Sequence, residues 1–286
     1  MRATMILYPR NVKCDEKGFN WLAGVAHQTM PLWHEHIVFD ARHLAFFDAN
    51  LCAPFGAILH DIEKADNTFD LGRVPGPVLK VWSQNDFGPR FGGGRMNDTY
   101  STTLAYRRFA LQENRKVFAA YMQRELLSKD LPEMSHETRT AFAESICEIF
   151  DNAGAHSQSE NGIFSCGQFF PGRENISFTI ADTGVGFRRN IEARTQRTWS
   201  DESAIEWATQ KGHTTRLENG GYGLAFLKDF FTSNGGRLQI VSGHGFWQIH
   251  GQRENKIVLR HPFPGSFVNL EINTREEIPR GEATSH

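Results

Sequence analysis

The strongest constraint in this sequence is the stretch from Ser135 to Ser157, which predicts a single amphipathic helix at the centre of the fold. Ser135 is a suitable N-cap, and Glu137 in the first turn favours the helix dipole. The apolar residues recur at helical spacing and form one stripe, made of Phe142, Ile146, Ile149, Phe150 and Ala153. We therefore expect this helix to pack against a core.

A second row of side chains runs beside that stripe and is polar. Glu144, Glu148 and Asn152 are spaced four residues apart and share one face of the helix. A carboxylate one turn from a carboxamide suits a site that handles a metal ion and a water or hydroxyl. The alternative is the solvated flank of an ordinary core helix, and the helix alone favours that alternative.

Two glycine-containing segments further along the chain favour a site. The segment from Asn175 to Ala181 alternates like a half-buried strand and leads into Asp182-Thr183-Gly184-Val185-Gly186. A second segment, Gly220-Gly221-Tyr222-Gly223-Leu224, opens a helix expected over Tyr222 to Ser233. Glycines before a helix start leave free N–H groups and the helix dipole available to a phosphate.

Together these three motifs resemble the GHKL ATPase superfamily, which includes gyrase-type topoisomerases, sensor histidine kinases and anti-sigma-factor serine kinases. The motifs are E-x-x-x-N (Glu148 to Asn152), D-x-G-x-G (Asp182 to Gly186) and G-G-x-G-L (Gly220 to Leu224). In motif style the chain is most similar to the anti-sigma kinases and to stand-alone histidine-kinase-like ATP-binding proteins. The resemblance implies an α/β fold in which residues 104–286 form a two-layer sandwich of mixed sheet and helices.

The same resemblance implies binding of ATP and Mg²⁺. Asn152 would ligate magnesium together with phosphate oxygens, and Glu148 would be the catalytic residue that orients or deprotonates a water or hydroxyl. Asp182 would accept a hydrogen bond from the adenine amine. Lys211 to Arg216 would lie in a lid that closes on the phosphates. The further nucleotide contacts expected are His156, Gly184, Gly186, Lys211, Thr214, Thr215, Arg216, Gly220, Gly221, Gly223, Leu224 and Ser266.

Taken singly, these residues have plainer interpretations. A glycine can serve a turn, and Asp182 can be a surface carboxylate. His156 can be a favourable cation at a helix C-terminus, and Lys211 and Arg216 can be solvated loop charges. The order and spacing of the three motifs favour the joint interpretation.

Residues 1–103 predict a small α/β unit because strands and helices alternate along them. Strands are expected at Met5–Tyr8, His36–Asp40 and Leu44–Asp48, and a helix at Ala49–Glu63. This order is similar to STAS domains, the fold of anti-sigma-factor antagonists. It departs from them at the helix start, where Asp48 to Leu51 carries no phosphorylatable Ser or Thr. The alternative is an unrelated α/β unit.

The remaining chain predicts one more helix and two more strands. The pattern from Tyr106 to Ser128 predicts a long helix that packs on the central helix or forms a subunit contact, which would make the protein a homodimer. Strands are expected at Arg237–Ser242 and Ser266–Ile272, separated by a polar excursion from Gly243 to Arg260.

Composition limits the partners and the cellular compartment expected for the protein. A net charge of −2 argues against a surface that binds nucleic acid. The four cysteines form no C-x-x-C pair, which favours free thiols in a reducing compartment. No apolar run has the length of a membrane span, and the N-terminus lacks a signal-peptide pattern. We therefore expect a cytoplasmic protein that does not contact a membrane.

The predicted function is to hydrolyse ATP or to transfer its γ-phosphate, as an ATPase or a serine- or histidine-kinase-like phosphotransferase. This activity would serve signalling or regulation with a protein partner. The alternative is a nucleotide-gated binding module with little turnover. A sensor histidine kinase is less favoured, because no phosphoacceptor histidine lies on a predicted pair of dimerising helices.

Overall fold

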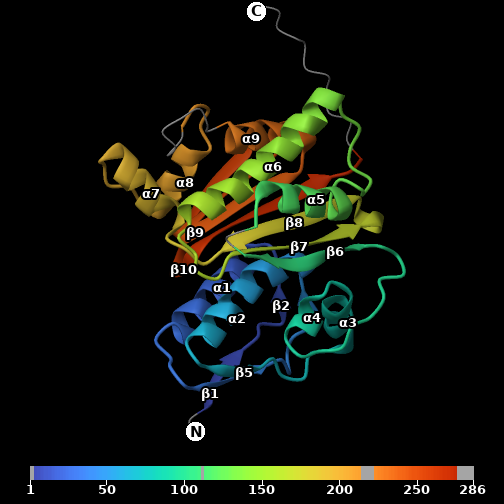
Figure 1. The fold of residues 1–286 in the computed structure, drawn as a ribbon, viewed down its shortest axis with the longest axis vertical. Helices are drawn as coiled ribbons and strands as arrows, with labels where there is room; N and C mark the ends of the chain where they lie inside the picture. The colour runs from blue at the N-terminus through green and yellow to red at the C-terminus, as the bar shows by residue number, and fades with distance from the viewer. Residues whose placement is uncertain (1–2, 111–112, 214–221, 276–286) are drawn as a thin grey trace, which may run out of the picture.

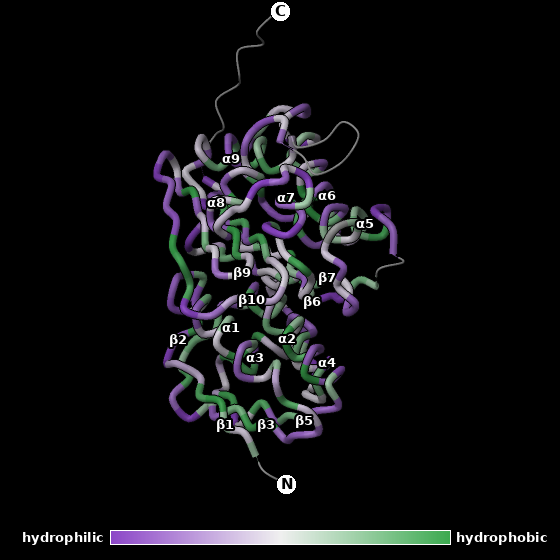
Figure 2. The backbone as a smooth tube through the Cα atoms, turned by 90° about the vertical axis from the view of Figure 1, so that its left-hand side faces the viewer, coloured by the Kyte–Doolittle hydropathy of each residue, from purple (hydrophilic) through white to green (hydrophobic). Residues whose placement is uncertain are grey.

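The computed structural model describes residues 3–110, 113–213 and 222–275, and their fold is α/β, as predicted. The described strands form a five-stranded sheet of order β6-β7-β8-β10-β9, a three-stranded sheet of order β1-β3-β5, and a two-stranded sheet of β2 and β4. Both smaller sheets are parallel and the large sheet is antiparallel. The elements stack in four layers (Figure 1), and the view at right angles shows the same order (Figure 2).

The bounds of the elements are as follows. The strands are β1 Ala3–Leu7, β2 Asn11–Val12, β3 His36–Asp40, β4 Phe46–Phe47, β5 Thr68–Asp70, β6 Thr103–Phe109, β7 Ile163–Phe170, β8 Asn175–Asp182, β9 Arg237–His250 and β10 Arg253–Asn273. The helices are α1 Glu16–Thr29, α2 Cys52–Lys64, α3 Gly76–Gln84, α4 Phe87–Arg90, α5 Arg115–Glu125, α6 His136–His156, α7 Gly186–Thr195, α8 Asp201–Ala208 and α9 Gly223–Asn234, with short 3-10 turns at Ala49–Leu51 and Pro171–Arg173.

The predicted central helix is α6, and it covers one face of the large sheet with α5 and α9 (Figure 1). Its N-cap is Ser135, whose hydroxyl accepts a hydrogen bond from the N–H of Thr138 at 3.2 Å. The predicted apolar stripe is buried from Phe142 to Phe150 and half-buried at Ala153, and the rings of Phe142 and Phe230 lie 4.7 Å apart where α6 meets α9. Burial of this stripe holds α6 at a fixed position over the sheet.

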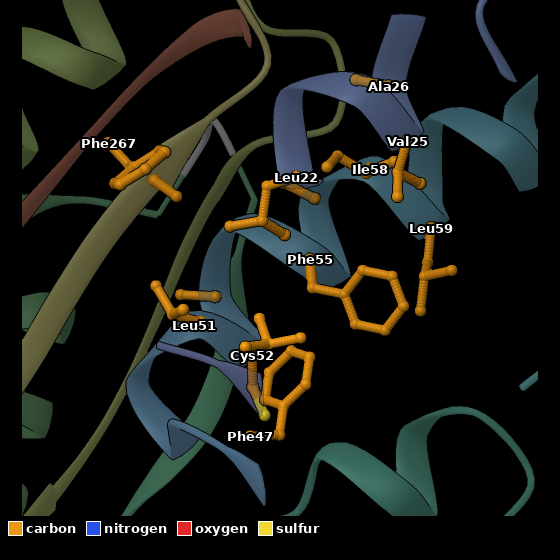
Figure 3. Packing of buried hydrophobic residues seen from close by; sticks show 14 of the residues in the cluster. Leu22, Val25, Ala26, Phe47, Leu51, Cys52, Phe55, Ile58, Leu59 and Phe267 are labelled. Carbon is orange, nitrogen blue, oxygen red and sulfur yellow. The ribbon is translucent and has the colours of Figure 1, made fainter. Parts of the chain in front are cut away.

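The opposite face of the large sheet is covered by α1 and α2 from the N-terminal part of the chain. The ring of Phe19 on α1 lies 4.9 Å from that of Phe246 and 5.2 Å from that of Phe267. Figure 3 shows Leu22 of α1 and Ile58 of α2 in the same cluster as Phe267. The small parallel sheet β1-β3-β5 contributes to this cluster from the other side of the two helices.

Because α1 and α2 cover the opposite face of the large sheet, the burial of strand β8 differs from the sequence prediction. Strand β8 was expected to be half-buried, but it is buried on both faces from Ile176 to Asp182. A buried polar network also joins the two parts, because the amide nitrogen of Asn50 donates to Asn269 at 2.7 Å and to Thr179 at 3.0 Å. The predicted boundary between residues 103 and 104 falls at the start of β6, and the two parts share one core.

Two predictions were wrong, and three helices were missed. Tyr106–Ser128 is not one helix, because β6 pairs with β7 and a separate α5 begins after the N-cap Asn114. Gly243–Arg260 is not an excursion, because β9 and β10 stay paired almost to their common turn. Helices α1, α4 and α7 were not predicted. In the described part of the chain, no helix has both the length and the apolar character needed to cross a membrane.

Candidate functional site

A large cavity lies between α6, the centre of the large sheet, and the pair α7 and α8. It holds about 880 Å³ of empty space, counting the part open to solvent. Figure 1 shows α7 and α8 beside the C-terminal end of α6. Six of the residues predicted from the sequence line this cavity: Glu148, Asn152, Asp182, Gly186, Leu224 and Ser266. The structure therefore brings together residues that are more than 100 positions apart in the chain.

Asp182, at the end of β8, is buried at the base of the cavity with 2 % of its surface exposed. Its Oδ2 accepts a hydrogen bond from the Ser266 hydroxyl at 2.7 Å, and its Oδ1 accepts from the Gly184 N–H at 2.8 Å. The register of β10 on β8 pairs Ser266 directly with Asp182. Burial raises the pKa of Asp182 to about 6, and the hydrogen bonds from Ser266 and Gly184 oppose that rise.

Glu148 and Asn152 reach the same cavity from α6, one helical turn apart. The Glu148 carboxylate lies against the first residue of α9, because a Cβ added to Gly223 would be 2.7 Å from its Oε2. Because glycine has no Cβ, the carboxylate can keep this position against α9. Glu144 has a different environment: it does not line the cavity but forms an ion pair with Arg115 of α5.

The turn after Asp182 is held tightly against its neighbours. Gly186 has a positive φ of +73°, and a Cβ there would lie 2.5 Å from the Ser242 hydroxyl, which accepts a hydrogen bond from the Phe187 N–H. The N–H of Val185 donates to the carbonyl of Ser157, just after α6, at 2.6 Å. These contacts connect the D-x-G-x-G turn to both the sheet and the central helix.

Sequence reasoning missed the wall that α7 and α8 contribute. Phe187 and Asn190 line the cavity from α7, and Trp207 and His213 line it from α8 and the residues after it. The rings of Trp207 and His213 are stacked at 4.5 Å, and the His213 Nδ1 lies 3.0 Å from the Trp207 carbonyl oxygen. A signal was available, because α7 begins at Gly186, the last residue of the D-x-G-x-G motif.

Other predicted residues do not line the cavity or lie outside the described part. Gly184 supports Asp182 through its N–H, and Lys211 is exposed and is not among the lining residues. His156 is the last residue of α6, and its side chain lies outside what the structure describes. The residues that fall outside the described ranges are Thr214, Thr215, Arg216, Gly220 and Gly221.

The cavity combines apolar walls with few polar groups, as small-molecule sites commonly do. Ile149, Ile180 and Val268 supply apolar surface next to Asp182. Among residues 3–110, 113–213 and 222–275, no three His, Cys, Asp or Glu side chains are grouped to hold a metal ion. A metal at Asn152 would therefore need ligands brought by a bound molecule.

Comparison with known proteins adds no assignment, since no protein-family model matches this chain and no curated protein matches it.

Proposed function

We propose that this protein binds Mg²⁺–ATP in the cavity between α6 and α7 and hydrolyses it or transfers its γ-phosphate. The observation that carries the proposal is the convergence of Glu148, Asn152 and Asp182, from two distant segments, on one partly apolar cavity. The motif resemblance to GHKL ATPases supports it, since those are the residues that the resemblance implicates.

The buried end of the cavity suits a purine base. Asp182 offers a carboxylate fixed by Ser266 and Gly184, which would accept a hydrogen bond from the exocyclic amine. Ile180 and Val268 would cover the faces of the base with apolar surface. With a pKa of about 6, Asp182 is mostly ionised at neutral pH and is ready to accept.

The end of the cavity near α9 suits the phosphates. Magnesium prefers oxygen ligands and keeps several waters, so the Asn152 carboxamide oxygen together with phosphate oxygens makes a suitable shell. This donor set fits a metal that enters with the nucleotide. Bound magnesium would neutralise phosphate charge.

Glu148 is the proposed catalytic residue. Its carboxylate lies at the first residue of α9, one turn of α6 away from Asn152. From this position it would orient and deprotonate the water or hydroxyl that attacks the γ-phosphate. Phosphate transfer depends mainly on such positioning and on charge neutralisation.

The proposal places the protein in the cytoplasm, where it would signal through a protein partner. The described cysteines, Cys14, Cys52, Cys147 and Cys166, are all free and buried, which fits a reducing compartment. The partner would respond to the nucleotide state of the cavity.

Calorimetric titration of the full chain with ATP, with and without magnesium, tests the proposal, and phosphate release is then measured on the same sample. Magnesium-dependent binding with steady release supports hydrolysis. Binding without release supports the nucleotide-gated module, or a kinase that needs its protein substrate. An absence of binding at every magnesium concentration would contradict the assignment of the cavity.

A further inference from the structure

The N-terminal part of the chain touches the two loops that border the candidate nucleotide site. Asp61, on α2, accepts hydrogen bonds through its Oδ1 from the Thr183 hydroxyl at 3.1 Å and from the Asn161 side chain. One turn later, Lys64 forms an ion pair with Glu160. Thr183 follows Asp182 in the chain, so α2 holds the residue next to the proposed base-binding carboxylate.

We infer that Asp61 is a positioning residue for the nucleotide site, which holds the Asp182 turn in place and puts a second negative charge behind Asp182. The N-terminal part would in this way control the pH range over which the site accepts a base. This inference rests on the proposed function for its ligand. The contact between α2 and the Asp182 turn does not depend on that function.

The charges around Asp61 and Asp182 favour an influence of one carboxylate on the pKa of the other. Burial raises the pKa of Asp61 to about 6, and burial is also the main reason that the pKa of Asp182 is about 6, with a smaller upward contribution from the Asp61 charge. Lys64 lowers the pKa of Asp61 but is itself paired with Glu160. In the described ranges no cation forms an ion pair with Asp182, and the titratable groups that share its cavity are Glu148 and His213.

Asp61 lines a second cavity that is open to solvent, and a residue of the same cavity precedes Gly265, which packs against Asp182. A second cavity between α1 and α2, lined partly by Ile58 and Pro264, opens onto Asp61. The next residue, Gly265, packs so closely that a Cβ there would lie 2.7 Å from the Asp182 Oδ1. The Asp61 carboxyl can therefore exchange its proton while it remains part of the packing around Asp182.

The direction in which nucleotide affinity changes with pH follows from the raised pKa of Asp182. Asp182 accepts a hydrogen bond from the base only when it is ionised, so affinity should fall as the pH drops through about 6. Removing the Asp61 charge lowers the pKa of Asp182 and moves this fall to lower pH. Because Asp61 itself carries its charge mainly above about pH 6, the affinity difference between the variant and the unaltered protein should be largest near and above that pH and small at pH 5.

The test is Asp61→Asn in the full chain, which keeps an oxygen to accept from Thr183 while removing the charge. Affinity for Mg²⁺–ATP is measured by calorimetry between pH 5 and 8. The ¹³C carboxyl signal of Asp182 is titrated separately, without nucleotide. We expect both midpoints to move to lower pH. Asp66→Asn is the matched control, because Asp66 is an exposed carboxylate just beyond the same helix, and its midpoints should not move.

The outcomes separate the inference from the proposed function. Unchanged midpoints in folded Asp61→Asn would overturn the inference, as would a loss of affinity that is equal at every pH. If the unaltered protein binds no nucleotide, the proposed function fails, and the carboxyl titration still decides whether Asp61 controls Asp182. Asp61→Ser, which keeps a hydroxyl but no charge, replaces Asp61→Asn if that variant does not fold, with the same expected direction.

Discussion

At the scale of single residues, one helix face carries side chains with different environments. Glu148 and Asn152 face the cavity, whereas Glu144, one turn earlier in the same row, pairs with Arg115 outside it. The common spacing of the three residues therefore does not imply a common role. This difference gives each of the two cavity residues a matched control on its own helix.

Asn152→Ala should weaken magnesium-dependent ATP binding by roughly tenfold or more, because it removes a neutral oxygen ligand next to charged groups. Calorimetry with and without magnesium measures the change. Glu144→Ala, on the same face but outside the cavity, should bind like the unaltered chain. Equal affinities for the Asn152 variant and the control would contradict the metal assignment.

Glu148→Gln should leave ATP affinity nearly unchanged and reduce phosphate release at saturating ATP by roughly 10² to 10⁴-fold, the usual contribution of a general base. The amide keeps the size of the side chain but cannot take up a proton. Phosphate release measured beside calorimetry on the same sample separates binding from turnover. Turnover that persists at the original rate would remove Glu148 from the proposed mechanism.

At the scale of elements, the junction of α6 with α9 determines the surroundings of the Glu148 carboxylate, at the end of the cavity proposed to hold the phosphates. The first residue of α9 is in contact with the Glu148 carboxylate, so a side chain at position 223 would force that carboxylate to move. Local helix propensity favours alanine over glycine at such a position. The choice of glycine is therefore explained by the contact between helices and not by the helix itself.

Gly223→Ala should lower turnover by roughly tenfold or more, because the added Cβ displaces the Glu148 carboxylate by a distance that matters for positioning. The better helix propensity of alanine should keep the melting temperature within a few degrees of the original. Gly76→Ala is the control, since Gly76 is the first residue of α3 and its added Cβ meets nothing within 4 Å. A Gly223 variant with normal turnover would show that the contact is not needed.

At the scale of the whole molecule, the large sheet is covered on both faces by helices that come from opposite ends of the chain. The N-terminal helices bury Phe246 and Phe267 of the sheet through Phe19, and Asn50 adds a buried polar contact with Asn269. Cores of this kind unfold cooperatively, because neither side is complete without the other. The N-terminal and C-terminal parts should therefore behave as one folding unit.

Phe19→Ala should lower the free energy of unfolding by about 3–5 kcal/mol, the usual cost of removing a buried phenylalanine ring. The whole chain should still unfold in one transition, followed in parallel by near-UV circular dichroism and by tryptophan fluorescence. Trp33→Ala, at a side chain that is 62 % exposed, should change stability by no more than about 0.5 kcal/mol. Two separate transitions, of which only one moves, would instead support independent units.

Prediction from the sequence succeeded where the signal was local. The helix with Ser135 as its cap, the strand β8 before Asp182, and the helix opening at Gly223 all follow from spacing, capping and turn chemistry within a few residues. It failed for Tyr106–Ser128, where apolar residues at helical spacing include those that alternate across strand β6. Whether that segment forms a strand or a helix depends on its pairing with β7, which is distant in the chain.

The sequence by itself determined the class of fold, the central helix and five motif residues that meet in one cavity, namely Glu148, Asn152, Asp182, Gly186 and Leu224. Each of these depends on short-range periodicity or on a motif beside a strand or helix end. Only the tertiary structure decided that Glu144 lies outside the cavity, that Trp207 and His213 form part of its wall, and that Asp61 accepts a hydrogen bond from Thr183, the residue after Asp182. Contacts between segments that are far apart in the chain depend on how whole faces pack, and no local pattern records that packing.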